Sequence, residues 1–162
     1  MNLDNHHLRA AIAEAQAAEA AGEVPVGAII VAPDGRTVLA RGNNQVLRGC
    51  DPTAHAEIVA LRAAGLALQN YRLTGCSLYV TLEPCSMCAG AILHARIARL
   101  VYAAPDPKAG ACGSVLPVMN HPQLNHRLEV VSGVMAEECS TMLTSFFRAR
   151  RLEASQQQGK ES

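Results

Sequence analysis

The sequence predicts an α/β fold, in which one mixed β-sheet carries helices on both of its faces. Segments with helical periodicity alternate with short β-branched runs, and 162 residues give room for one domain of ordinary size. Hydrophobic residues make up 49% of the chain and charged residues 17%, which excludes intrinsic disorder and a collagen-like repeat. Only 3% of the residues are aromatic, so the core must consist mainly of Ala, Val, Leu and Ile.

The N-terminal part of the chain predicts a helix followed by a β-hairpin. Residues 5–21 place apolar side chains at helical spacing, and Gly22 follows as a natural stop. Two strand-like runs, residues 24–32 and 36–41, flank an Asp-Gly dipeptide that is typical of a tight hairpin turn. A polar loop is expected after the hairpin, over residues 42–50.

A second helix is expected to begin at Asp51 and Pro52, which have the features of an N-cap and a first helical position. It should run to about Ala64, with Gly65 closing it. The other expected elements are strands over residues 77–82, 100–103 and 128–132 and helices over residues 85–94 and 135–153.

Residues 104–126 are rich in proline and glycine and predict a long loop, which in a small domain is usually functional. The polar tail, residues 155–162, is expected to be disordered. No repeat or linker divides the chain, so we expect a single domain over residues 1–154.

Charge and targeting signals are weak. The formal net charge is zero and gives no first-order sign of a polyanionic partner. No signal-peptide pattern and no apolar run of membrane-spanning length is present, so a cytoplasmic protein without a membrane partner is expected. In that reducing compartment the 6 cysteines predict metal ligands or small buried residues rather than disulfides.

Two short motifs carry the chemistry. The first is His55-x-Glu57, and the second, 26 residues later, is Pro84-Cys85-x-x-Cys88. Cys85 and Cys88 share one face at a helix start, where the helix dipole favours thiolates. If the two helix starts meet, one His and two Cys bind Zn²⁺ and leave the fourth tetrahedral position open, as a catalytic zinc requires.

Glu57 is the residue that favours catalysis over a purely structural metal. A carboxylate beside zinc-bound water can take up the water proton and later deliver it to an amine leaving group. The pattern H-x-E followed by P-C-x-x-C is the signature of zinc deaminases.

Other interpretations of these motifs remain open. The C-x-x-C pair is also compatible with a redox dithiol or with a structural zinc site. The residues that could complete a structural site are Cys50, Cys76, Cys112 and Cys139. His94, His121 and His126 are expected to be ordinary polar residues.

Around these motifs the chain resembles the bacterial tRNA-specific adenosine deaminases, within the cytidine deaminase-like zinc deaminase superfamily. The resemblance extends from about residue 8 to about residue 152. The segments that carry it are residues 23–28, 51–58, 70–73, 78–91, 110–114 and 146–151.

The resemblance implies a three-layer α/β/α cytidine deaminase-like fold with a five-stranded mixed sheet, usually in a homodimer. It implies conversion of the wobble adenosine of a tRNA anticodon, typically in an arginine tRNA, to inosine. One zinc ion per subunit would be held by His55, Cys85 and Cys88. Zinc-bound water would attack C6 of the adenine, with Glu57 as the proton shuttle.

The resemblance also implies contacts to the anticodon stem-loop. Asn44 corresponds to a base-contacting residue, and the long loop with Asp106 and Lys108 corresponds to the segment near the flipped nucleotide. In the C-terminal helix the matching residues are Phe147, Arg148, Arg150 and Arg151. Without RNA, Asn44 could merely cap a turn, Phe147 could border the core, and the arginines could form a solvated helix end.

Two alternatives to a tRNA deaminase remain. The same chemistry on a free base or nucleoside, such as guanine, cytosine or cytidine, predicts a small closed pocket and no role for the C-terminal arginines. A non-catalytic, zinc-stabilised RNA-binding module predicts that Glu57 is dispensable.

Overall fold

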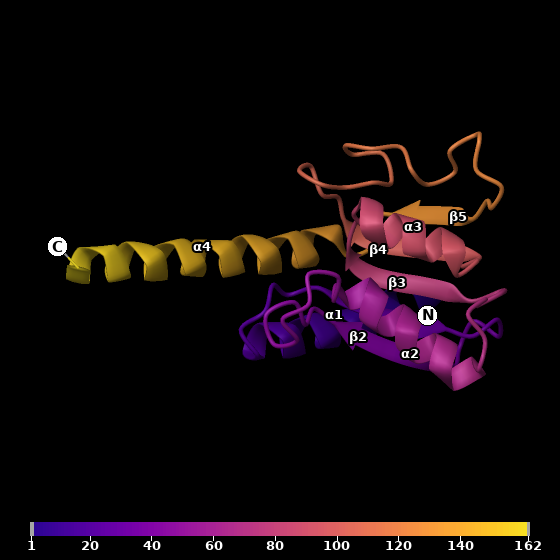
Figure 1. Ribbon diagram of the computed structural model, residues 1–162, viewed down its shortest axis with the longest axis horizontal. Helices are drawn as coiled ribbons and strands as arrows, with labels where there is room; N and C mark the ends of the chain where they lie inside the picture. The colour runs from indigo at the N-terminus through magenta and orange to yellow at the C-terminus, as the bar shows by residue number, and fades with distance from the viewer. Residues whose placement is uncertain (1, 162) are drawn as a thin grey trace.

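The computed structural model describes residues 2–161 and shows one five-stranded sheet between two layers of helices (Figure 1). The strands lie in the order β2-β1-β3-β4-β5, with β1 antiparallel to both of its neighbours and β3, β4 and β5 parallel. Their bounds are Gly27–Val31 (β1), Val38–Asn43 (β2), Ser77–Leu82 (β3), Arg99–Ala104 (β4) and Glu129–Ser132 (β5). The mixed sheet and the three-layer α/β/α architecture expected from the sequence are confirmed.

Each face of the sheet has its own core. On one face, α1 (Leu3–Ala20) and the first part of α4 (Ala136–Glu161) cover a cluster that includes Ile29, Tyr79 and Val101. On the other face, α2 (Ala56–Leu68) and α3 (Ser86–His94) cover the alternate residues of the same strands. The small side chains that the composition predicted line these contacts, so that the helices lie close to the sheet.

Glycines permit the closest contacts between helices and strands. A Cβ on Gly27 of β1 would lie 2.0 Å from the Ala11 carbonyl oxygen of α1. On the opposite face, a Cβ on Gly42 of β2 would lie 2.4 Å from the Ala56 carbonyl oxygen and 2.6 Å from the Ala60 nitrogen of α2. Gly42 therefore sets how closely the first turns of α2 approach the sheet.

The predicted start of the second helix was wrong. The helix begins at Ala56 with His55 as its N-cap, not at Asp51. The Asp51 carboxylate accepts hydrogen bonds from the backbone nitrogen of Thr53 at 2.9 Å and from its hydroxyl at 2.7 Å. These bonds close a turn over residues 51–53, and a side chain that caps a turn in this way competes with helical hydrogen bonding.

The end of that helix was also misplaced, because α2 continues through Gly65 to Leu68. Gln69 takes the left-handed conformation at φ 53° and its backbone nitrogen donates to the carbonyl oxygens of Gly65 and Leu66. A non-glycine residue thus provides the C-terminal cap that the sequence assigned to Gly65. The third helix begins one residue later than predicted, with Cys85 as its N-cap.

The bounds of the two hairpin strands differ from the prediction. β1 is shorter than the predicted run, and β2 begins later and extends to Asn43. The structure also differs from the sequence expectation at the C-terminus, where α4 is helical through Glu161 instead of ending near residue 153. Most of residues 155–161 are good helix formers, which explains why the helix continues. All of them are exposed, and this part of α4 extends away from the body of the protein (Figure 1). Residue 162 lies outside the described residues. None of the helices in residues 2–161 combines the length and apolarity that a bilayer crossing needs.

The contact at Gly42 leads to a stability prediction. Gly42→Ala should lower the free energy of unfolding by about 1–3 kcal/mol, because the added methyl group pushes α2 away from β2. Urea denaturation measures the change.

Gly90→Ala in α3 is the matched control, since nothing lies within 4 Å of its added Cβ. Alanine is the better helix former by about 1 kcal/mol, so this variant should be as stable as the wild type or more stable. Equal destabilisation by both substitutions would contradict the packing role of Gly42.

Candidate active site

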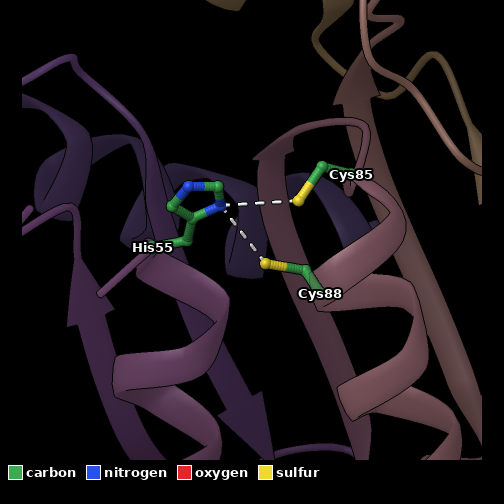
Figure 2. A group of neighbouring side chains, drawn as sticks. All are labelled: His55, Cys85 and Cys88. Atoms are coloured by element: carbon green, nitrogen blue, oxygen red, sulfur yellow. Dashed lines mark hydrogen bonds between the residues drawn. The ribbon is translucent and has the colours of Figure 1, made fainter. Parts of the chain in front are cut away.

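The two motifs of the sequence meet where α2 and α3 begin. The Nδ1 atom of His55 lies 3.5 Å from Sγ of Cys85 and 3.5 Å from Sγ of Cys88 (Figure 2). His55 is the N-cap of α2, Cys85 is the N-cap of α3, and Cys88 follows in the first turn of α3. Residues more than 25 positions apart are thus brought together at one edge of the sheet.

This cluster has the geometry of a zinc site. In residues 2–161, His55, Cys85 and Cys88 form the one group of at least three metal-binding side chains whose ligand atoms all lie within 4.8 Å of one another. Tetrahedral zinc, with Zn–N of about 2.0 Å and Zn–S of about 2.3 Å, separates nitrogen and sulfur ligands by about 3.5 Å. The observed separations match that value, and three protein ligands leave one tetrahedral position for water or substrate.

The three side chains perturb one another strongly. Hydrogen bonds from Cys88 and His55 lower the pKa of the Cys85 thiol to about 3. The hydrogen bond with Cys85 in turn raises the pKa of His55. The same sulfur, together with burial, raises the pKa of Cys88. The cluster therefore favours the thiolate form of Cys85, which is the form that binds a metal.

Glu57 is the buried carboxylate of the site. It lies in the first turn of α2 with 4% of its surface exposed, and burial raises its pKa above the ordinary value. A cavity of about 220 Å³ is lined by Glu57, His55 and Cys85 together with Asn44 and Asp106. A carboxyl group that takes up a proton readily thus lies in the same cavity as two of the three metal ligands.

Asn44 both caps a turn and lines the cavity. Its Oδ1 accepts a hydrogen bond from the Val46 nitrogen at 3.4 Å, which is a turn-capping contact, and the residue lines the cavity. Asp106 likewise accepts hydrogen bonds from the nitrogens of Lys108 and Ala109 while lining the cavity.

The residues matched to tRNA contacts separate into two groups. A second cavity of about 520 Å³ shares Val24, Leu82 and Asp106 with the first. Lys108, Phe147 and Arg151 line this second cavity, so the long loop and α4 meet beside the metal cluster. Phe147 is 44% exposed, in contrast to the buried Phe146 beside it.

Arg148 and Arg150 are not among the residues that line either cavity. The Arg150 guanidinium lies 5.0 Å from the centre of the Phe146 ring and donates a hydrogen bond to the Gly22 carbonyl oxygen. Arg150 thereby braces α4 against the end of α1, which is a structural role that the sequence analysis did not identify.

The remaining cysteines and histidines do not join the cluster. Burial raises the pKa of Cys76, that of Cys112 to about 12 and that of Cys139 to about 11, so these thiols stay protonated. Cys50 is exposed. His126 contacts the Ile97 carbonyl oxygen through Nε2 at 2.7 Å, and Nδ1 of His121 accepts a hydrogen bond from the Gln123 nitrogen.

Sequence reasoning missed two further buried carboxylates, Glu23 and Glu83, which are 1% and 2% exposed. Glu83 is one of the residues that line the small cavity. Burial alone would raise the pKa values of both carboxylates. Hydrogen bonds from the backbone nitrogens of Arg48 and Leu47 lower the pKa of Glu23, and bonds from Ser114, Cys112 and Asp106 lower that of Glu83. The available signal in the sequence was a charged residue directly beside an apolar run.

Comparison with known proteins places this site in a family. The model of the cytidine and deoxycytidylate deaminase zinc-binding region matches residues 1–104, which include all three candidate ligands. The tRNA-specific adenosine deaminase of Haemophilus influenzae is 54% identical over 151 residues, which cover 93% of this chain and 87% of that protein.

Solved structures agree with this placement. One from a study of A-to-I editing by tRNA:A34 deaminases at the wobble position of transfer RNA is 47% identical, with a TM-score of 0.81 over 85% of this chain and 99% of that chain. Guanine deaminase from Bacillus subtilis is 41% identical, with a TM-score of 0.62 over 70% of this chain and 71% of that chain. The chain belongs to the tRNA-specific adenosine deaminases, a family that shares the zinc-binding region of the cytidine and deoxycytidylate deaminases.

Proposed function

We propose that the protein hydrolyses adenosine to inosine at the wobble position of a tRNA anticodon and releases ammonia. The observation that carries the proposal is a buried Glu57 in the same cavity as His55 and Cys85, in a chain that aligns with a tRNA-specific adenosine deaminase over 93% of its length. The cytoplasm is the expected compartment for this reaction, and an arginine tRNA is the substrate that the resemblance favours.

The residues have complementary roles in this reaction. His55, Cys85 and Cys88 would hold a zinc ion, which would lower the pKa of a bound water so that it can act as nucleophile. Glu57 accepts one proton from the attacking water and passes it to the adenine ring nitrogen; it then accepts the remaining proton of the oxygen added at C6 and passes it to the departing amine. Its burial suits this task, because the raised pKa allows the carboxyl group to hold the proton between the two transfers.

The second cavity supports an RNA substrate over a free base. Lys108 and Arg151 bring two cations to its lining, and Phe147 contributes an aromatic ring that is partly exposed. Cations contact phosphate oxygens and exposed aromatic rings stack on unpaired bases, which are the contacts that an anticodon loop offers. A single-nucleoside substrate would leave this cavity without a function.

We also propose that two copies of the chain associate through α2 and α3. An apolar groove of about 970 Å³ lies between these helices, and Leu66 and Tyr71 at its edge are each 73% exposed. A second copy is the partner that we favour, because the groove is continuous with the helices that carry the metal cluster, and an isologous contact buries it in both subunits.

A deamination assay tests the proposed function directly. Zinc-loaded protein is offered an arginine anticodon stem-loop with adenosine at the wobble position, the same loop with guanosine there, and free adenosine, cytidine, cytosine and guanine. We expect inosine from the wobble-adenosine loop and no ammonia from the other compounds. Ammonia from a free base or nucleoside alone would instead favour an activity like that of the guanine deaminase from Bacillus subtilis.

Glu57→Gln should separate metal binding from catalysis. The amide cannot accept the water proton, so kcat should fall by about 10²–10⁴-fold, while zinc content by mass spectrometry stays at one ion per chain. Glu19→Gln, at an exposed position of α1, should leave both quantities unchanged. Full turnover by Glu57→Gln would exclude Glu57 as the proton shuttle.

The division among the C-terminal arginines predicts unequal effects on RNA binding. Arg151→Ala should raise KM for the stem-loop about tenfold and lower the slope of affinity against salt concentration by about 1, because one phosphate contact is lost. Arg148→Ala should change KM less than threefold, because Arg148 is not among the residues that line the two cavities.

Arg150→Ala should act mainly on stability, because it removes the brace between α4 and α1. Its melting temperature should therefore fall while the salt dependence of RNA binding stays that of the wild type. Equal effects of all three substitutions on KM would show that the cavities do not determine which arginines contact RNA.

A further inference from the structure

Two loops without regular structure form part of the wall of the small cavity. One follows β2 and contributes Asn44, and the other follows β4 and contributes Asp106 and Ala109. Backbone in such loops is mobile unless other groups satisfy its hydrogen bonds. Each loop is bonded to one buried carboxylate that has no assigned role, Glu23 for the first loop and Glu83 for the second.

Glu83 accepts four hydrogen bonds from the loop after β4. Its Oε1 accepts from the Asp106 nitrogen at 3.1 Å and from the Ser114 hydroxyl. Its Oε2 accepts from the nitrogens of Cys112 at 3.0 Å and of Ser114 at 3.2 Å. Both ends of residues 106–114 are therefore tied to a single side chain at the end of β3.

The same loop is packed against the Glu83 carboxylate as well as bonded to it. A Cβ on Gly110 would lie 2.3 Å from Oε2 and 2.4 Å from Cδ of Glu83, and 2.6 Å from the Asp106 carbonyl oxygen. The loop therefore closes around Glu83 only because residue 110 has no side chain. The Ala111 nitrogen adds a bond of 2.8 Å to the Pro84 carbonyl oxygen, beside Cys85.

Glu23 plays the equivalent part for the loop after β2. Its carboxylate accepts hydrogen bonds from the Leu47 nitrogen at 2.9 Å and from the backbone nitrogen and Nε of Arg48, both at 3.0 Å. Nη2 of Arg48 then donates to the Asn44 carbonyl oxygen at 2.7 Å and to Oδ1 of Asn43 at 2.7 Å. Through Arg48, Glu23 reaches the residue that lines the cavity.

We propose that Glu23 and Glu83 are positioning residues for the substrate: each holds one loop, so that Asn44 and Asp106 form opposing parts of the wall that receives the target nucleotide. Neither carboxylate is one of the three candidate zinc ligands, and Glu83 also lines the small cavity itself, so we expect both to act on substrate binding rather than on zinc affinity. The role assigned to the loops rests on the proposed deaminase function, whereas the coupling of each carboxylate to its own loop does not depend on it.

Amide hydrogen exchange of the zinc-loaded protein, without substrate, tests that coupling. Glu83→Gln replaces one acceptor oxygen by an NH₂ group, and in either amide orientation that group faces donors of the loop. Exchange should rise at least about tenfold at residues 106–114 and stay unchanged at residues 44–48. Glu23→Gln should show the reverse pattern, so that each variant serves as the control for the other.

Steady-state kinetics on the wobble-adenosine stem-loop test the consequence for binding. Both variants should raise KM about tenfold and change kcat less than threefold, with zinc content unchanged. Ser114→Ala removes only the hydroxyl donor and leaves the Glu83 charge and its backbone donors in place, so it should raise KM by a smaller factor than Glu83→Gln.

Each outcome decides one of the two proposals. Loss of zinc in either variant, or exchange that rises equally in both loops, would overturn the positioning role. If Glu83→Gln does not fold, Gly110→Ala replaces it, since the added methyl group displaces the carboxylate without changing charge and should raise exchange over the same residues. A wild-type protein without activity on the stem-loop would refute the proposed function, while the exchange patterns would still decide the coupling.

Discussion

The rest of the site depends on one geometric constraint: α2 and α3 must begin at the same edge of the sheet, with their N-caps within ligand distance. Parallel β3 and β4 place the start of α3 at the carboxyl end of β3. The close approach of α2 at Gly42 brings His55 to the same edge. A helix start offers unpaired backbone N–H groups and a positive dipole end, so that a negative charge on the Cys85 sulfur is favoured there. The low pKa of Cys85 is consistent with that environment.

Three buried carboxylates surround this edge, and their surroundings give them different properties. Glu23 and Glu83 accept several hydrogen bonds from backbone nitrogens, which offset the cost of burying their charge and keep their pKa values low. For Glu57, burial is the dominant influence, and its pKa rises. The side chain suited to carrying a proton is therefore Glu57, whose pKa is raised by burial, whereas Glu23 and Glu83, which are held ionised by donors of the loops, are suited to organising those loops.

The C-terminal helix serves two purposes with neighbouring residues. Cys139 is buried in the core on the α1 face of the sheet and Phe146 is also buried, whereas Phe147 and Arg151 line the cavity beside the active site. The Arg150 contact with the Phe146 ring and the Gly22 carbonyl oxygen connects the helix to α1. Because the packed face fixes the rotation of α4, it also determines which of the basic residues over positions 148–151 line this cavity.

The sequence by itself determined the elements and the chemistry of the site. Periodicity located each strand and helix approximately, because local stereochemistry sets the spacing of apolar residues in an element. The motif spacing and the resemblance identified the metal-binding region and the deaminase family, because the reaction sets the residue types that the site needs. Tertiary structure decided the rest. The Asp51 turn displaced the start of α2, and Gln69 displaced its end. Glu23 and Glu83 acquired hydrogen-bond partners up to 31 residues away. Arg150 contacts the Gly22 carbonyl oxygen, whereas its neighbour Arg151 lines a cavity. These outcomes depend on which groups meet after the chain packs, and contacts between distant segments leave no periodic signal in a single sequence.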